Sequence, residues 1–197
     1  NPPEHHELLP FTRMLSGPMD YTPGIFDILY ERAKKSPLRK KWNMVDSKDC
    51  RVNTTLAKQI ANWVIIYSPL QMASDMIENY EGHPAFLFFR DFNADCDWSE
   101  ALAGEPGEFV VIARKAKDNY YLGATTNEEA RNVNIKLNFL EKGKTYKATI
   151  YADGKDADWE TNPTSYEIIE KTVNANDNLE IIMAKGGGQA ITFIPVL

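Results

Sequence analysis

The sequence predicts a fold in two unequal parts: a short alternating β/α segment, followed by an all-β antiparallel sandwich of Greek-key type. Three observations favour this fold. Residues 53–79 carry apolar side chains at the three-to-four spacing of one helix face. From residue 108 onwards the apolar pattern changes to short runs of period two. Turn residues such as Asp153-Gly154 separate these runs, with no helical pattern between them.

The composition is that of a globular protein with a full hydrophobic core. Of the 197 residues, 43% are hydrophobic and 11% are aromatic. The formal net charge of −6 argues against a nucleic-acid partner, which would favour a basic surface. No apolar run approaches the ~20 residues that span a bilayer. Two cysteines are too few for a disulfide framework, and their number is compatible with one bridge or with two free thiols.

The first part of the chain has the pattern of a short helix, a short strand, a loop and a long helix. Residues 8–15 are apolar enough for a short helix, which Gly17-Pro18 should end. Residues 18–21 are a candidate buried strand. Residues 27–53 are charged and mixed, which predicts a long loop with one helical turn.

Residues 53–79 form the clearest predicted element. Thr54 or Thr55 is suited to the N-cap, because a threonine hydroxyl can accept a hydrogen bond from a backbone N–H of the first turn. Pro69 falls inside the pattern and should kink the helix, since it removes one backbone hydrogen bond. Apolar residues outside the main face, Ile65 among them, predict that the helix is covered on more than one side.

The second part contains seven runs with the alternation of half-buried antiparallel strands. Val133, Ile135 and Leu137, for example, alternate with polar neighbours. The triple glycine before the last run predicts a strand connection with positive φ, because the strand–loop–helix context of a phosphate loop is missing. The predicted strands are residues 108–114, 119–125, 132–139, 145–152, 165–173, 178–184 and 189–195.

The first twenty-four residues combine rigid and ionisable groups. They hold two of the three histidines and five of the eleven prolines, together with Glu4, Glu7 and Asp20. Pro2 and Pro3 should present Glu4 in a nearly fixed direction, because proline restricts φ. A surface loop with scattered charges is the alternative.

Three stretches carry a resemblance to a known enzyme family. They are NPPEHHELLPFTRMLSGPMDYTPGIF, VNTTLAKQIANWVIIYSPLQMASD and KGGGQAITFIPV. Through them the chain resembles the late catalytic region of glycoside hydrolase family 97, the calcium-dependent α-glucosidases and α-galactosidases. The resemblance covers almost the whole chain and is weakest over residues 30–50.

The resemblance implies that residues 1–84 are the end of a (β/α)8 barrel, with its eighth strand at residues 18–21. Residues 85–107 would connect this barrel tail to a C-terminal β-sandwich at residues 108–197. Active sites of such barrels lie at the C-terminal ends of the strands, which would place Glu4 and Asp20 near the sugar.

The resemblance also implies hydrolysis of terminal α-linked glucose or galactose by two carboxyl groups, one of which protonates the departing oxygen. Glu4 is the candidate general acid, with Glu7 as its rival. His5, His6 and Asp20 are the candidates for substrate binding. Calcium is the implied cofactor, and Glu4 and Glu7 are its candidate ligands. Because calcium takes about six to eight oxygen ligands, others must come from elsewhere.

The second catalytic carboxylate and the remaining calcium ligands would lie upstream of Asn1. We therefore expect an oligosaccharide and the N-terminal remainder of the same enzyme as partners, and an isolated fragment without activity. The chain opens inside a proline-rich motif without a methionine, as we expect of a piece of a larger protein. No targeting signal is visible, and a periplasmic or secreted location is implied only by the family. A homo-oligomer is compatible with this picture.

A non-catalytic role is the alternative. The β-domain could be a module for carbohydrate binding or for oligomerisation. Aromatic residues could stack on sugar rings, although cores and interfaces use the same residue types. The candidates for such a platform are Trp98, Tyr120, Tyr121, Trp159 and Tyr166.

Overall fold

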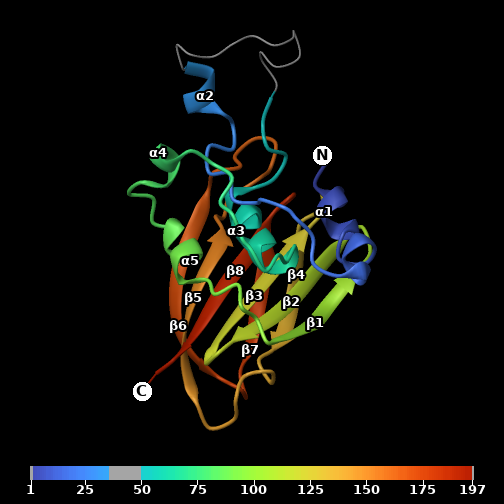
Figure 1. The fold of residues 1–197 in the computed structure, drawn as a ribbon, viewed down its shortest axis with the longest axis vertical. Coiled ribbons are helices and arrows are strands. Elements are labelled where there is room, and N and C mark those ends of the chain that lie inside the picture. The colour runs from blue at the N-terminus through green and yellow to red at the C-terminus, as the bar shows by residue number, and fades with distance from the viewer. Residues whose placement is uncertain (1, 36–49, 197) are drawn as a thin grey trace.

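The computed structural model describes residues 2–35 and 50–196. Within them, helices come first and strands follow (Figure 1). The helices are α1 (Glu4–Leu8), the 3₁₀ helix Arg13–Ser16, α2 (Glu31–Lys35), α3 (Leu56–Ile65), α4 (Ile77–Tyr80) and α5 (Phe86–Asp91). The strands are β1 (Trp98–Glu105), β2 (Phe109–Ala116), β3 (Asn119–Thr126), β4 (Arg131–Lys136), β5 (Thr145–Asp153), β6 (Tyr166–Asn174), β7 (Asn178–Met183) and β8 (Gly188–Pro195).

The strands form two antiparallel sheets. The larger has the order β1-β2-β3-β8-β5-β6, and the smaller pairs β4 with β7. The chain leaves the large sheet after β3, returns for β5 and β6, and leaves it again for β7. The last strand, β8, then enters between β3 and β5. This arrangement confirms the predicted antiparallel β-sandwich.

The large sheet is covered on both faces, because successive side chains of a strand point to opposite sides. In β3, Tyr120, Leu122 and Ala124 join the core beneath the small sheet. Tyr121 lies on the other face, in the core beneath the helices. Gly123 shares that face: a Cβ there would lie 2.8 Å from the carbonyl oxygen of Ala61. The absence of a side chain lets α3 lie close to the sheet.

Helix α3 lies across the middle strands of the large sheet and contacts β3 and β8 (Figure 1). All ten of its residues are buried, which confirms the prediction that it is covered on more than one side. Thr55 is the N-cap, since its hydroxyl accepts a hydrogen bond from the Lys58 N–H.

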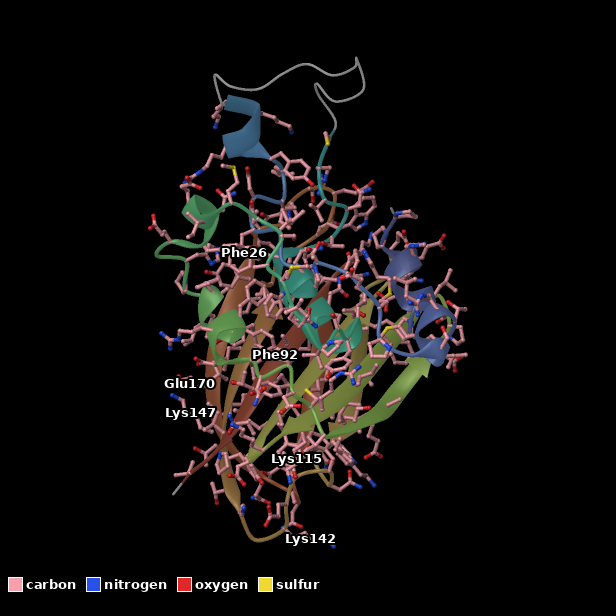
Figure 2. The ribbon with its side chains drawn as sticks, in the orientation of Figure 1. Phe26, Phe92, Lys115, Lys142, Lys147 and Glu170 are labelled. Atoms are coloured by element: carbon pink, nitrogen blue, oxygen red, sulfur yellow. The ribbon has the colours of Figure 1, made fainter. Side chains whose placement is uncertain are left out.

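An aromatic cluster packs beside α3 and reaches the large sheet, where Phe92 lies against Tyr121 of β3. Trp63 stacks on Phe89 with ring centroids 4.1 Å apart, and Phe26 and Phe92 lie against the same pair. Figure 2 labels Phe26 and Phe92, two members of this cluster. The indole N–H of Trp63 donates to the Pro23 carbonyl oxygen, which holds the preceding loop in place.

The prediction of one continuous helix over residues 53–79 is wrong, because α3 ends at Ile65 and the chain is next helical in α4. Ile66 leaves the helical conformation, with φ −94° and ψ 78°. A residue before proline avoids the helical region, so Ser68 before Pro69 cannot continue the helix easily. The Ser68 hydroxyl instead exchanges hydrogen bonds with the backbone of Leu70. The apolar pattern continues, but Leu70 is 69% exposed and Ile77 is 71% exposed.

The first part differs from its predicted pattern in two further places. The chain is helical over α1 and Arg13–Ser16 and turns between them, so the single helix over residues 8–15 is wrong. Residues 18–21 do not form a strand. The helical turn expected within residues 27–53 is confirmed as α2, and residues 36–49 of that segment lie outside the described residues. A barrel tail is not seen in the part of the chain that the structure describes.

Strand β1 was missed, because it lies inside the segment predicted to connect the two parts. Its sequence, WSEALAGE, has many exposed positions, and its register with β2 shifts between Ala101 and Ala103. A bulge breaks the period-two alternation from which a strand is predicted. Gly104 leaves room for the Phe11 ring, since a Cβ there would lie 2.8 Å from Phe11 Cζ.

The triple glycine is a strand connection, as predicted, with Gly186 at φ +59°. Asp153 Oδ2 accepts hydrogen bonds from the N–H groups of Ala184 and Gly188, at 2.9 and 2.8 Å. A Cβ on Gly187 would collide with that oxygen. The seven predicted strands all correspond to observed strands, β2 to β8.

Both cysteines, Cys50 and Cys96, are free thiols. None of the helices in the described ranges is long and apolar enough to cross a membrane.

Candidate functional site

Helix α1 carries four of the five site residues predicted from the sequence. It begins where the carbonyl oxygens of Pro2 and Pro3 accept the N–H groups of His5 and His6. Glu4 lies in the first turn of α1, where its negative charge interacts favourably with the helix dipole. A five-residue helix does not persist alone, so tertiary contacts must hold it.

The structure divides these residues into an exposed and a buried group. Glu4 and His5 are exposed on α1, and Asp20 is exposed on the loop that follows. His6 and Glu7 are buried, with relative exposures of 6% and 0%. The exposed residues can reach a ligand without rearrangement, whereas a ligand could reach a buried one only through a cavity.

Glu7 forms a fully buried ion pair with Lys58 of α3. Lys58 Nζ lies 2.7 Å from Glu7 Oε1, and both side chains have 0% exposure. The same ammonium donates to the carbonyl oxygens of Pro3 and Thr126, at 3.0 and 2.7 Å. Glu7 Oε2 accepts a hydrogen bond from the Thr125 hydroxyl at 2.8 Å. Three segments distant in the sequence therefore meet at one ammonium group.

Burial raises the pKa of Glu7 and lowers the pKa of Lys58, because it disfavours both charged forms. Their mutual attraction opposes both shifts. The Glu7 carboxylate is paired with the Lys58 ammonium, accepts one hydrogen bond from the Thr125 hydroxyl and has no access to solvent. In this arrangement both carboxylate oxygens of Glu7 face the protein, whereas the exposed Glu4 can reach a ligand.

His6 lines a polar cavity of about 190 Å³. Its Nε2 lies 3.0 Å from the Tyr21 hydroxyl, whereas Nδ1 is buried without a hydrogen-bond partner among the described residues. Tyr30 and Arg51 also line the cavity. Desolvation, together with the nearby Lys58 charge, lowers the pKa of His6 to about 3. A neutral imidazole can donate or accept a hydrogen bond there without carrying charge.

Calcium is not accommodated by the predicted ligands in this chain alone. Glu7 is committed to Lys58 and Thr125, and Glu4 is exposed. Among residues 2–35 and 50–196, no group of three or more carboxylate, histidine or cysteine side chains could hold a metal ion. This set of residues supplies too few oxygen atoms for a calcium site.

The sequence pattern alone did not identify Lys58 and Thr125 as functional. Lys58 lies in a helix whose apolar residues extend beyond one face, and a lysine that becomes buried in such surroundings needs a partner. That signal was present, but its partner lies 51 positions earlier in the chain. Thr125 is one of several polar residues on β3 and has no distinguishing local signal.

The five aromatic residues proposed as a sugar platform do not share one surface. Tyr120 and Tyr121 point to opposite faces of β3 and are 5% and 1% exposed. Trp98 packs against the Tyr120 core. Trp159 lies against Gly186, and Tyr166 stacks on His83. A common stacking surface for sugar rings is therefore absent from these positions.

A comparison with known families accounts for the β-strands. The family model for the glycosyl hydrolase 97 C-terminal domain, described as oligomerisation, matches residues 95–194, which include nearly all of β1 to β8. The chain belongs to glycoside hydrolase family 97.

Relatives of this family 97 chain are similar to it over nearly its whole length, including the helical segment before the β-domain. A retaining α-galactosidase from Bacteroides thetaiotaomicron is 31% identical over 93% of the chain, and a probable retaining α-galactosidase from Streptomyces bingchenggensis is 28% identical over 97%. A family 97 enzyme from Pseudoalteromonas sp. strain K8, solved in complex with panose, is 45% identical over 100% of the chain, with a TM-score of 0.89.

The family 97 chain spans about a quarter of the length of these relatives: 26% of each α-galactosidase and 29% of the solved enzyme. The family and the β-sandwich are shown for this chain, and its relatives are glycoside hydrolases.

Proposed function

We propose that this chain is the C-terminal part of a family 97 glycosidase and that its β-sandwich assembles the enzyme into oligomers. The observation that carries this proposal is the match of residues 95–194 to a domain described by its role in oligomerisation. The buried positions of Tyr120 and Tyr121 also favour assembly over carbohydrate binding by the sandwich.

Light scattering coupled to size-exclusion chromatography tests the assembly role. The chain has a mass of 22.4 kDa, and we expect it to elute with at least twice that mass. The full-length enzyme should be oligomeric as well, and should become monomeric when the sandwich is removed. A monomeric full-length enzyme would refute the assembly role.

We further propose that α1 supplies the general acid of the complete enzyme. Glu4 is exposed at the start of a helix that Glu7 joins to Lys58 of α3 and to Thr125 of β3. Its carboxyl group would protonate the oxygen of the departing sugar, while an upstream carboxylate attacks the anomeric carbon or activates water. The substrate class is terminal α-linked glucose or galactose. The similarity to α-galactosidases and to an enzyme solved with panose supports this class.

His6, His5 and Asp20 remain the proposed substrate-binding residues. His6 is the best supported, since it lines a polar cavity with Tyr30 and Arg51, and its buried Nδ1 has no hydrogen-bond partner among the described residues. A sugar hydroxyl offers the donor and acceptor that a neutral imidazole needs. Calcium also remains a prediction for the complete enzyme, with Glu4 as a ligand and other ligands from upstream. A periplasmic or secreted location remains a prediction too.

The acid role is tested in the full-length enzyme with Glu4→Gln. Removing an acid slows the cleavage of a sugar leaving group by about 100-fold or more. The loss should be much smaller on nitrophenyl α-glycosides, because an activated leaving group needs little protonation. Glu129→Gln is the matched control, since Glu129 is also an exposed glutamate. An equal loss on both substrates would remove Glu4 from the acid role.

A further inference from the structure

Arg114 of β2 is a buried arginine without an ion-pair partner among the described residues. It is 8% exposed. Its Nε donates to the Val64 carbonyl oxygen at 2.7 Å, in the last turn of α3, and its guanidinium lies 4.6 Å from the centroid of the Tyr67 ring. Within residues 2–35 and 50–196, no carboxylate pairs with Arg114 and no acceptor binds its terminal nitrogens, Nη1 and Nη2.

A buried guanidinium needs more compensation than this. Arginine keeps its charge at every physiological pH, and removing that charge from water is costly unless an opposite charge is near. Arg131 shows the paired arrangement: its guanidinium lies over the Phe109 ring and also pairs with Glu108 Oε2 at 2.8 Å. For Arg114, the Val64 carbonyl and the Tyr67 ring occupy one of five N–H donors and one face. The remaining donors are available to a ligand.

The acidic groups next to Arg114 are the Cys96 thiol and the Tyr67 hydroxyl. Burial raises the pKa of Cys96 to about 11, although the charge of Arg114 opposes this shift. Burial also raises the pKa of Tyr67. Both groups are therefore neutral near pH 7. Asp95 and Asp97 lie near the thiol, but neither comes within ion-pair distance of Arg114.

Arg114 lines a pocket of about 260 Å³. Ser99 of β1 lies directly opposite it in the sheet, and Ile112 lies on the same face of β2, two positions earlier. The other wall is the segment of residues 10–18, which runs beside β1 and β2 (Figure 1). This segment contributes the apolar side chains of Pro10, Met14 and Pro18. Neither Nη1 nor Nη2 of Arg114 is sealed from solvent, so both can reach a ligand in the pocket.

The chemistry of the pocket fits a carboxylate on a small apolar body. The planar edge of a guanidinium binds the two oxygens of a carboxylate through parallel hydrogen bonds. A phosphate has more charged oxygens to satisfy, and the pocket adds the Ser99 hydroxyl to the donors of Arg114. The apolar walls favour a hydrocarbon body over a polar one. Burial of Arg114 strengthens its attraction for an anion, because the surroundings screen charge less than water does.

We propose that this pocket is a binding site for a small monocarboxylate with a compact hydrocarbon body, and that Arg114 binds the carboxylate group. The pocket shares no lining residue with the cavity of His6. The site depends neither on the acid role of Glu4 nor on the assembly of the sandwich into oligomers. Its test therefore stands apart from the tests of both.

An NMR titration of the full-length enzyme with 3-methylbutanoate tests the site. Binding should occur with a dissociation constant of about 1 mM or below, as for a small ligand that fits its pocket. The amide of the same acid has nearly the same shape without the charge and should bind at least about tenfold more weakly, as should inorganic phosphate. Absence of binding, or equal binding of the acid and its amide, would overturn the proposal.

Variants locate the binding. Arg114→Gln should weaken the binding of 3-methylbutanoate by at least about tenfold, and Arg114→Lys should recover part of it, since lysine keeps the charge without the planar fork. Lys115→Gln is the matched control (Figure 2). Lys115 is the next residue on β2, and its ammonium lies over the Tyr120 ring in the core on the opposite face of the sheet. Its loss should leave the binding unchanged.

Ser99→Trp keeps the test decisive if Arg114→Gln does not fold. Ser99 is exposed on the edge strand β1, where a large side chain can be accommodated, and an indole there would fill the pocket beside an intact Arg114. This variant should abolish binding. Unchanged binding in Ser99→Trp would place the ligand elsewhere and overturn the proposal. Binding to the 197-residue chain but not to the full-length enzyme would show that the enzyme itself fills the pocket, which would overturn the proposal as well.

Discussion

Gly123 of β3 lies directly beneath the backbone of α3, so that a Cβ at this position would come within 2.8 Å of the Ala61 carbonyl oxygen. The same Cβ would lie 2.8 Å from Val64 Cβ. Strand and helix backbones approach each other here more closely than any side chain would permit. This contact sets the distance between α3 and the large sheet, and therefore also the position of Lys58 on α3.

Gly123→Ala should therefore destabilise the chain by about 2 kcal/mol or more, because the added methyl group would overlap the backbone of α3, which is held in place by its own packing. Urea denaturation measures the change. Gly143→Ala is the comparison, because Gly143 has φ +82° but open space around it. Its cost should be that of backbone strain alone, about 1 kcal/mol. Similar costs at both positions would argue against the close helix–sheet contact.

His6 should make the chain sensitive to acid. Its pKa is lowered from 6.5 to about 3 in the folded state, mainly by burial. Below pH 6.5 the His6 imidazole binds a proton in the unfolded chain but stays neutral in the folded chain. The free energy of unfolding therefore falls as the pH drops. The loss between pH 7 and pH 5 is about 2 kcal/mol. Denaturation at both pH values should show that His6→Gln removes this dependence and that His5→Gln, at the exposed neighbour, does not.

Asp153 should lower the stability of the chain as the pH rises, opposite to the effect of His6. Burial raises its pKa from 3.8 to about 6. Between these pH values the unfolded chain loses a proton that the folded chain retains, so stability falls as the pH rises and stays lower above pH 6. The full effect is about 3 kcal/mol. Asp153→Asn keeps an oxygen for the N–H groups of Ala184 and Gly188, and should gain stability relative to the parent between pH 4 and pH 8.

The end of α3 can be tested by truncating side chains on either side of it. Ile65 is fully buried, so Ile65→Ala should cost about 2–5 kcal/mol. Ile77 continues the same apolar pattern but is 71% exposed, and Ile77→Ala should change the stability by less than about 0.5 kcal/mol. Denaturant midpoints of the two variants provide the measurement. A comparable loss at both positions would favour one continuous packed helix.

The sequence was informative wherever the signal was local. The alternation of Val133 and Ile135 with polar neighbours predicts strands, since one face of each strand must be buried. Thr54 or Thr55 as a helix cap and a positive φ in the triple glycine follow from the chemistry of single residues, and the structure has Thr55 and Gly186 in these roles. The motif around Glu4 carried the family resemblance, and the comparisons confirm that family.

Other features depended on packing between distant segments. Apolar residues at helical spacing continue from Ile65 to Ile77. Only the tertiary structure shows that the later ones are exposed and do not pack against another element. Strand β1 was missed because its partner strand and a bulge define it more than its own pattern does.

By itself, the sequence determined the β-sandwich, a helix start at Thr54 or Thr55 and the family, because periodicity, capping and motifs are properties of neighbouring residues. Only the tertiary structure decided which carboxylate is exposed. Glu4 and Glu7 lie three positions apart in one short helix, yet Glu7 meets Lys58, and also Thr125 at 118 positions further along the chain. A buried charge finds its partner through the fold, and no local pattern encodes a contact over that distance.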